Sequence, residues 1–408
     1  MVNSNGMLQG QIREDNTTNF PFSPDPNAYI PSVAGLPSTY DLAYIDPNFR
    51  NPQVWRSNIG IDKDLFAGIV GTFEGIYTQQ VHDMLFYDSN LRPPIGNLGG
   101  PDNRPLYGFS DEANRINPNI TNAVVMDNTS QGYSYSLTAQ FQKNFTQGFY
   151  AMVAYNYAVA KNMVDGNTQH FLSYENIHSV RGGNYPTLGY SLDDQRHRVI
   201  GSVSYKKEYA KNMASTISIF YEARNNGVES YVYNTDINGD LIAGNDLLFV
   251  PTENQLDEMQ FAPLTINGTT FSPDQQRDLF NQYIEQDAHL STRRGTYAVR
   301  NAIHFPMVGR LDLSFMQEFY MNIGGKRNTL QLRADIFNFT NMINKNWGAG
   351  QIIANESPIG IVAIDPVTNV PTYQLNPTSG DVPRETFTRT ANIGDVWQMQ
   401  VGIRYIFN

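Results

Sequence analysis

The chain has 408 residues, no cysteine and a formal net charge of −11 at pH 7. This acidic balance argues against a nucleic-acid-binding protein, because phosphate backbones are bound by basic surfaces. The lack of cysteine excludes disulfide scaffolds and thiolate metal sites. Charged residues make up only 16% of the chain and aromatic residues 12%, so charge is scarcer than in an average globular domain.

Long segments with a period of two run along the chain and predict β-strands, because successive side chains of a strand point to opposite faces. Several exceed the usual length of soluble strands and reach the roughly nine to eleven residues that cross a bilayer. No apolar run is long enough for a transmembrane helix, and the first residues lack the pattern of a signal peptide. The expected strands lie near 54–64, 67–87, 122–143, 148–161, 195–209, 212–227, 308–320, 327–341 and 396–408.

The connections between these strands alternate strictly between short and long. Those after residues 64, 143, 209 and 320 are tight, whereas those after 87, 161, 227 and 341 are long. Short periplasmic turns and long outer loops are typical of an up-and-down membrane barrel. We therefore expect an all-β fold, an antiparallel transmembrane β-barrel, with residues 1–53 as an outer-loop segment and 54–408 as barrel.

The two faces of the expected strands differ in polarity. One face carries aromatic and aliphatic residues, such as Leu137, Val203 and Ile403, and its single amide is Gln317. The other carries Ser, Thr, Gln and a few charged residues. An arginine or lysine facing lipid at the midplane costs about 2–4 kcal/mol, so the apolar face is expected to meet lipid. A soluble sheet with an apolar core face is the alternative, and the long strands and loop parity disfavour it.

Three stretches carry a resemblance to a known family: "LDDQRHRVIGSVSY" at 192–205, "LQLRADIFNFTNMINKNWG" at 330–348 and the closing "VGIRYIFN". From about Asn51 onward the chain resembles the C-terminal barrel of TonB-dependent outer-membrane receptors, in the Oar-like group of Bacteroidota that is related to SusC-like transporters. This resemblance implies a location in the cell outer membrane and a barrel of about 22 strands around an N-terminal plug. It also implies import powered through the TonB system.

The sequence departs from that family because neither a plug nor an export signal is recognisable in it. Nine strands also cannot close in the even-numbered way of bacterial barrels. We therefore expect the C-terminal portion of a larger barrel, whose partners are outer-membrane lipid, a missing plug and barrel half, TonB acting through the plug, and a surface lipoprotein. The transported ligand stays open between oligosaccharide, peptide and siderophore.

A large acidic outer loop is expected over residues 228–307, since its segment 229–296 holds eleven Asp/Glu against three Arg. Within "NTDINGDLIAGNDLLFVP", Asp236, Asn238 and Asp240 have the oxygen spacing of a calcium loop, and Asn245 and Asp246 are the further candidate ligands. The EF-hand pattern is not met, because Leu241 stands where the glycine belongs. The alternative is an Asx-rich turn without metal. No other cofactor is expected.

The same loop contains two expected helix starts. Thr252 with Gln255, and Ser272 with Gln275, both fit the capping box. Residues Leu279, Phe280, Tyr283 and Ile284 then form one apolar helical stripe. This helix is interpreted either as a lid over the pore or as part of a structured loop that packs on its neighbours, and the second reading is preferred.

Charged residues on the polar strand face are the remaining candidates. Glu318, Arg333, Asp335 and Arg404 are expected to face plug or substrate, or else to pair within the barrel wall. The motif "QRHR", from Gln195 to Arg198, is read as the outer rim, where the arginines meet acidic loops, in preference to an anion site. No catalytic or zinc motif is found, so we expect no enzyme. The functional hypothesis is nutrient import; the alternatives are an adhesin-like surface receptor and a passive porin.

Overall fold

The structure is a computed structural model, and it describes residues 23–25, 40–145, 147–166 and 169–407. Most of the expected outer-loop segment 1–53 therefore lies outside the described residues. None of the helices in the described ranges is long and apolar enough to cross a membrane.

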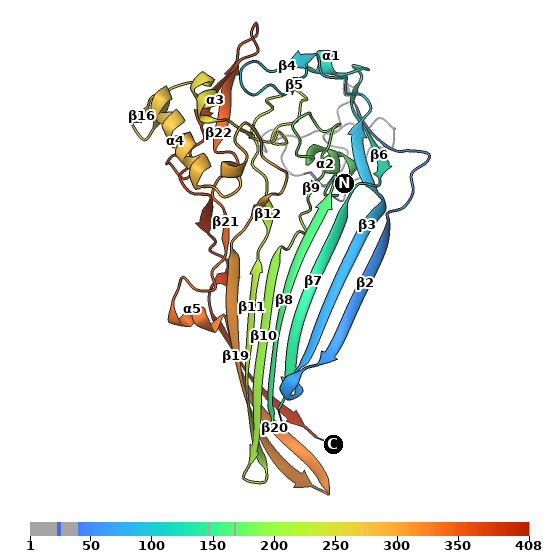
Figure 1. Cartoon of the computed structure of the whole chain (residues 1–408), viewed down its shortest axis with the longest axis vertical. Helices are drawn as coiled ribbons and strands as arrows, with labels where there is room; N and C mark the ends of the chain where they lie inside the picture. Colours follow the sequence, from blue (N-terminus) through green and yellow to red (C-terminus); the bar gives the residue numbers. More distant parts are fainter. Residues whose placement is uncertain (1–22, 26–39, 146, 167–168, 408) are drawn as a thin grey trace.

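The main body of the molecule is one large sheet of long strands (Figure 1). Each long strand pairs antiparallel with the next one in the chain. This arrangement confirms the all-β class and the up-and-down order. In spatial order the long strands are β2 (Gln53–Asp64), β3 (Val70–Asp88), β7 (Tyr133–Asn144), β8 (Phe149–Asn162), β10 (His197–Tyr209), β11 (Met213–Asn225), β19 (Met307–Ile323), β20 (Lys326–Phe337) and β25 (Gln398–Ile406).

One expected strand is interrupted in the structure. The segment predicted as 122–143 consists of β6 (Ile120–Thr129) and β7, separated around Gly132, whose φ is +133°. Both pieces pair with β3 in an unbroken register, because Asp83 faces Thr129 and Gln79 faces Tyr133. The period of two continues across the break, which is why the pattern predicted one strand. A short strand, β1 (Tyr40–Ile45), adds to β6 in parallel.

The sheet is open in this structure. Among the described residues, the long strand β2 pairs only with β3 and β25 only with β20, so these two are the outermost long strands, while the short strand β1 ends the branch through β6. The nine long strands form an open wall, which agrees with the expected portion of a larger barrel, and the larger barrel itself stays a prediction. The reason is geometric: across nine alternating strands the first and last run in the same direction, so they cannot form the next antiparallel pair.

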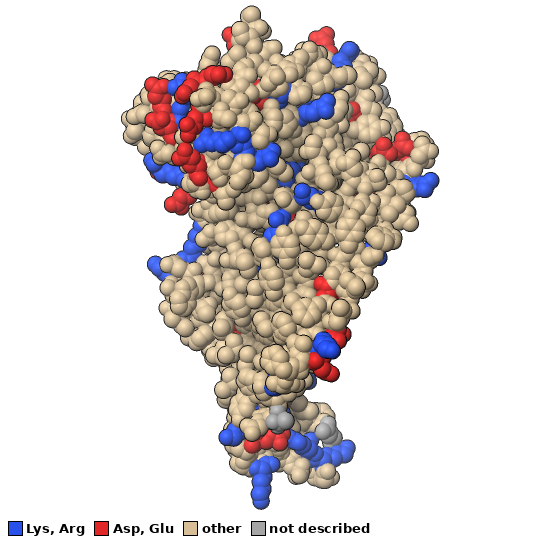
Figure 2. All heavy atoms as spheres, in the orientation of Figure 1, with Lys and Arg blue, Asp and Glu red and all other residues tan. Residues whose placement is uncertain are grey.

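The apolar face of the wall is exposed, as its composition predicts. Leu137, Val203 and Ile403 all lie on this face, and Ile403 is 75% exposed. The amide of Gln317 is satisfied within the wall, since its Oε1 accepts from Ser215 (2.6 Å) and its Nε2 donates to the carbonyl of Ala214 (3.1 Å). Figure 2 shows charged side chains gathered over the loops and at the hairpin turns, with few in the band between. This band is suited to a bilayer.

The long connections form a packed domain at one end of the strands, where Figure 1 places α3 (Glu253–Glu258) and α4 (Pro273–Gln286). Three connections, those after β3, β11 and β20, share one core that includes Leu106, Tyr233, Phe280 and Tyr373. The connection after β8 packs separately against β3 and β6, through Tyr174 and Ile177. We call this assembly the loop domain.

The remaining elements of the described residues are short. They are η1 (Phe66–Gly68), β4 (Gly96–Asn97), β5 (Pro105–Leu106), α1 (Asp111–Asn114), α2 (His170–Glu175), β9 (Gly189–Tyr190), β12 (Val228–Glu229), β13 (Phe249–Val250), β14 (Gln260–Phe261), β15 (Leu264–Ile266), β16 (Thr269–Phe271), η2 (Leu290–Thr292), β17 (Thr296–Tyr297), β18 (Ile303–His304), α5 (Phe339–Ile343), β21 (Gln351–Ile353), β22 (Ile359–Ile364), β23 (Pro371–Leu375), β24 (Phe387–Arg389) and η3 (Ile393–Asp395).

Candidate functional site

The four charged residues predicted for the polar face lie together on the last three strands. Gln331 of β20 faces Glu318 on one side and Arg404 on the other. Arg333 and Asp335 follow on the same strand at steps of two. Because alternate residues share a face, the four side chains lie on the face opposite to the apolar one.

Three of these four residues pair within the wall. Glu318 is buried and accepts hydrogen bonds from Lys206 Nζ (2.9 Å) and Gln331 Nε2 (2.7 Å). Arg333 Nε lies 2.8 Å from the carboxylate of Asp335. These three residues therefore make contacts of the kind that the alternative describes. Arg404 is exposed, and contact of any of the four with plug or substrate stays a prediction.

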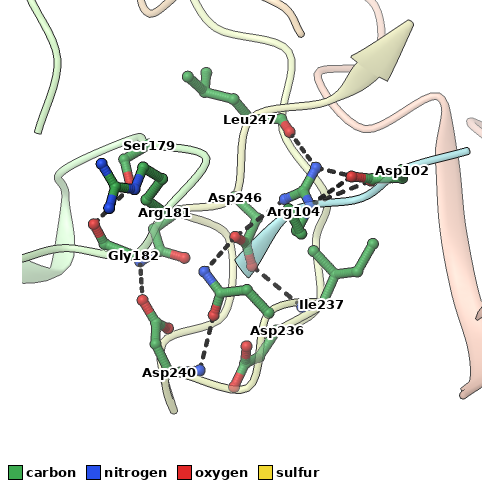
Figure 3. A network of polar contacts seen from close by, with 12 residues as sticks. Asp102, Arg104, Ser179, Arg181, Gly182, Asp236, Ile237, Asp240, Asp246 and Leu247 are labelled. Carbon is green, nitrogen blue, oxygen red and sulfur yellow. Dashed lines mark hydrogen bonds and ion pairs between the residues drawn. The ribbon is translucent and has the colours of Figure 1, made fainter. Parts of the chain in front are cut away.

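The centre of the loop domain is a buried ionic network that sequence reasoning missed (Figure 3). Arg104 is fully buried and binds both oxygens of Asp102, with Nη2 at 3.0 Å, and Asp246 at 3.1 Å. Its guanidinium also lies over the rings of Tyr233 and Tyr297. Arg104 and Asp246 are 142 residues apart in the chain. No local pattern links positions this distant, so the sequence alone gave no signal for the pair.

Of the five predicted calcium ligands, Asp246 belongs to this network and the other four lie close to it in the chain; the structure engages them in hydrogen bonds. The side chain of Asp236 accepts from the backbone N–H of Gly239 (2.6 Å) and Leu241 (2.8 Å). Asn238 Oδ1 and Asp240 Oδ1 accept from the N–H groups two residues further on, at 2.8 and 3.0 Å. These are Asx turns, the local geometry that the alternative reading expects.

The last two candidates complete the loop. Asn245 Nδ2 donates to Asp240 (3.3 Å), and Asp246 accepts from the side chain of Asn238 (2.7 Å). Within the described ranges no three carboxylate or histidine groups converge as a metal cluster. Leu241 adopts a φ of +72°, the left-handed conformation for which calcium loops use glycine at this position. A calcium ion here stays a prediction.

Burial raises the pKa of the carboxyl groups in this loop. The pKa of Asp236 is raised to about 6 by burial and by the neighbouring Asp240. Burial also raises the pKa of Asp246 well above its usual range, although Arg104 opposes the shift. Ionised carboxylates are therefore costly in this loop, and hydrogen bonds and Arg104 are what offset the cost.

The two helices of the acidic loop begin where the sequence predicts. Thr252 with Gln255, and Ser272 with Gln275, each form a complete capping box. The apolar stripe of α4 faces inward, since Phe280 and Ile284 are fully buried in the core of the loop domain. This packing confirms the structured-loop interpretation. The lid reading is not supported, because the stripe is already covered by protein.

The arginines of the "QRHR" motif meet acidic residues at the upper end of β10, as the rim reading predicts. Arg196 pairs with Asp194 at 3.0 Å and Arg198 with Glu222 at 2.7 Å. Burial would raise the pKa of Asp194, but hydrogen bonds from His304 and Ala160, together with Arg196, hold it below its ordinary value. Asp194 is therefore a counter-ion of Arg196.

Long antiparallel strands, a lipid-compatible face and a domain of long loops define the class of outer-membrane β-barrel proteins. The sequence model of the family described as "Outer membrane beta barrel domain" matches residues 2–360. The chain belongs to this family, and its location is the cell outer membrane. No curated protein and no solved structure matches the chain.

Proposed function

We propose that the chain is the C-terminal barrel portion of a TonB-dependent receptor that imports a large or scarce nutrient. The observation that carries this proposal is the open sheet, in which the outer sides of β2 and β25 have no strand partner within the part of the chain that the structure describes. Within a bilayer an open edge leaves backbone N–H and C=O groups without partners. Further strands must therefore cover both edges.

Strand parity supports a larger barrel. The nine long strands alternate in direction, and an all-antiparallel closed barrel needs an even total. An odd number of additional strands is thus required, which agrees with roughly 22 strands in the family that the sequence resembles. The polar inner face would then surround a plug, and the TonB system would act through that plug.

A second candidate function rests on the loop domain. Its core joins three connections and buries Arg104, Tyr231 and Phe280 completely. A structured domain of this kind can present a fixed surface, so we keep an adhesin-like or surface-receptor role without active transport as the alternative. A surface lipoprotein would be a suitable partner for the same surface in either case.

The experiment that tests the proposal combines genetics with uptake. The reading frame upstream of Met1 should encode a plug and the missing strands, and cells carrying the whole locus should accumulate labelled nutrient only while the proton gradient is intact. Binding of cells to a surface partner that persists after a protonophore is added, with no accumulation, would favour the alternative. A stop codon upstream and no neighbouring plug gene would contradict the transport proposal.

A further inference from the structure

A pocket of about 480 Å³ lies where the loop domain meets the upper ends of the strands. Its lining includes Lys161 at the end of β8, Tyr190 of β9, Arg196 before β10, Arg293 after η2 and His304 of β18. Pockets of roughly 300–1,000 Å³ accommodate small organic ligands. This pocket therefore has the size of a binding site for a small molecule.

Two cationic groups of the pocket, Lys161 and Arg293, have no ion-pair partner among the described residues. Lys161 Nζ lies 4.7 Å from the ring centre of Tyr190. Arg293 Nε donates to the carbonyl of Tyr297 at 3.0 Å, and its Nη2 to the hydroxyl of Thr296 at 3.5 Å. An ammonium group has three donors and a guanidinium five, so donors remain for a ligand.

The one carboxylate that lines the pocket, Asp287, is committed elsewhere. It is buried, and it accepts the N–H groups of His289 (2.8 Å) and Leu290 (2.7 Å). Its second oxygen accepts the hydroxyls of Tyr231 (2.7 Å) and Thr386 (2.6 Å). With four donors directed at it, Asp287 has no hydrogen-bonding capacity left for the two cations.

The walls strengthen the effect of these charges. Phe387, Ile303 and Val299 contribute apolar surface beside Tyr190. Hydrogen bonds between a charged donor and an oxyanion are stronger than neutral ones, and a low local dielectric strengthens them further. In a chain with a net charge of −11, two cations in one aromatic-lined pocket that lack an ion-pair partner in the described ranges indicate a ligand of opposite charge.

We propose that this pocket binds a small organic anion, with Lys161 and Arg293 holding a carboxylate or phosphate group and the aromatic walls contacting its apolar body. The inference deepens the proposed function, because it assigns an anionic class to the nutrient, and it rests on that function for its role in uptake. Arg196 is already paired with Asp194. It therefore contributes to anion binding chiefly through packing and through its positive electrostatic potential.

Binding is tested on the full chain in neutral detergent by calorimetric titration with phenyl phosphate and benzoate, and with phenol as the uncharged match. We expect the two anions to bind and phenol not to. Lys161→Gln and Arg293→Gln should each weaken binding roughly tenfold or more, whereas Lys161→Arg retains it. Lys207→Gln, on the exposed lower part of β10, is the matched control and should change nothing.

Circular dichroism and protease resistance establish that each variant is folded before its titration is interpreted. The proposal that the pocket binds an anion is wrong if neither anion binds up to millimolar concentration. It is also wrong if Lys207→Gln weakens anion binding as much as the pocket variants do. Displacement of phenyl phosphate by phosphatidylglycerol vesicles, but not by phosphatidylcholine vesicles, would contradict a small soluble ligand. The pocket would then bind an anionic lipid headgroup. Anion binding without energy-dependent uptake contradicts the proposed transport function but not the anion-binding site. Energy-dependent uptake that neither Gln variant changes contradicts the anion-binding site but not the transport function.

Discussion

At the scale of single residues, the loop domain depends on one buried cation. Arg104 stands between the carboxylates of Asp102 and Asp246, and all three side chains are fully buried. Removing one partner of a buried ion pair leaves an uncompensated charge and costs about 3–5 kcal/mol. We expect Arg104→Met to destabilise the loop domain by this amount while the strands persist.

Limited proteolysis of Arg104→Met should show rapid cleavage between residues 229 and 303, with the strands still protected. The triple variant Arg104→Met, Asp102→Asn, Asp246→Asn removes the unpaired charges and should recover part of the resistance. Unchanged cleavage in the single variant would show that the pair is not essential to the domain.

A histidine gives the loop domain a dependence on pH. Burial, with Arg300 nearby, lowers the pKa of His178 to about 4, and its Nδ1 lies 2.8 Å from the hydroxyl of Ser230. The unfolded chain takes up the proton near pH 6.5, so stability from this group is complete above pH 6.5 and is lost as the pH falls toward 4. The loss amounts to roughly 3 kcal/mol.

Asp236, whose pKa is raised to about 6, gains stability over the same range, so the effect of His178 is read from the difference between the wild type and His178→Asn in thermal unfolding. As the pH falls from 7 to 4, the midpoint of the wild type should fall relative to that of the variant. Asparagine keeps a hydrogen-bonding group for Ser230 without a titrating ring. An equally steep curve in the variant would place the pH dependence in other groups.

At the scale of elements, the turn at residues 236–246 can be explained either as a calcium loop or as an Asx-rich turn without metal. The structure satisfies its oxygens with N–H donors, including Ile242 N to Asp240 Oδ1 at 3.0 Å. We therefore expect Asp240→Ala to loosen this turn, at a cost of about 1–3 kcal/mol for the donors left unpaired. Hydrogen exchange of the loop, measured in EGTA and in millimolar calcium, checks both readings. Protection that rises with calcium in the wild type, but not in the variant, would establish the metal site.

The faces of the strands make a prediction about membrane insertion. Val203 and Ser204 are neighbours in the middle of β10, but Val203 points to the exposed apolar face and Ser204 to the polar one. We expect Val203→Arg to destabilise the protein in lipid vesicles by about 2–4 kcal/mol. Ser204→Arg should have a much smaller effect in the same urea titration. Equal effects of both substitutions would contradict the assignment of the lipid face.

The same elements show how far the sequence determined the outcome. Strand positions and faces follow from a period of two, which is local, and the helix starts at Thr252 and Ser272 follow from four-residue capping boxes. The pairing of Arg104 with Asp246, and of Lys206 with Glu318, joins residues 142 and 112 positions apart. Such contacts depend on how the loops and strands are brought together, so no window of sequence could predict them.

At the scale of the whole molecule, the directions of the edge strands determine which additional strands could close the sheet into a barrel. Strands β2 and β25 run in the same direction, because eight antiparallel pairings separate them. Direct pairing of these edges would be parallel. A second copy in the same membrane orientation offers edges that run the same way, so it meets the same obstacle. An odd number of strands from another source satisfies both edges.

Cysteine cross-linking tests this conclusion cleanly, because the chain has no native cysteine. Ile59 lies in the middle of β2 and Ile403 in the middle of β25, and both side chains are more than two-thirds exposed. We expect the pair Ile59→Cys, Ile403→Cys to form no disulfide in vesicles, within one chain or between copies. The control pair Leu332→Cys, Ile403→Cys should link readily, since these residues face each other across β20 and β25. A disulfide between the edges of one chain would mean that the nine strands close by themselves, and the larger barrel would then be wrong.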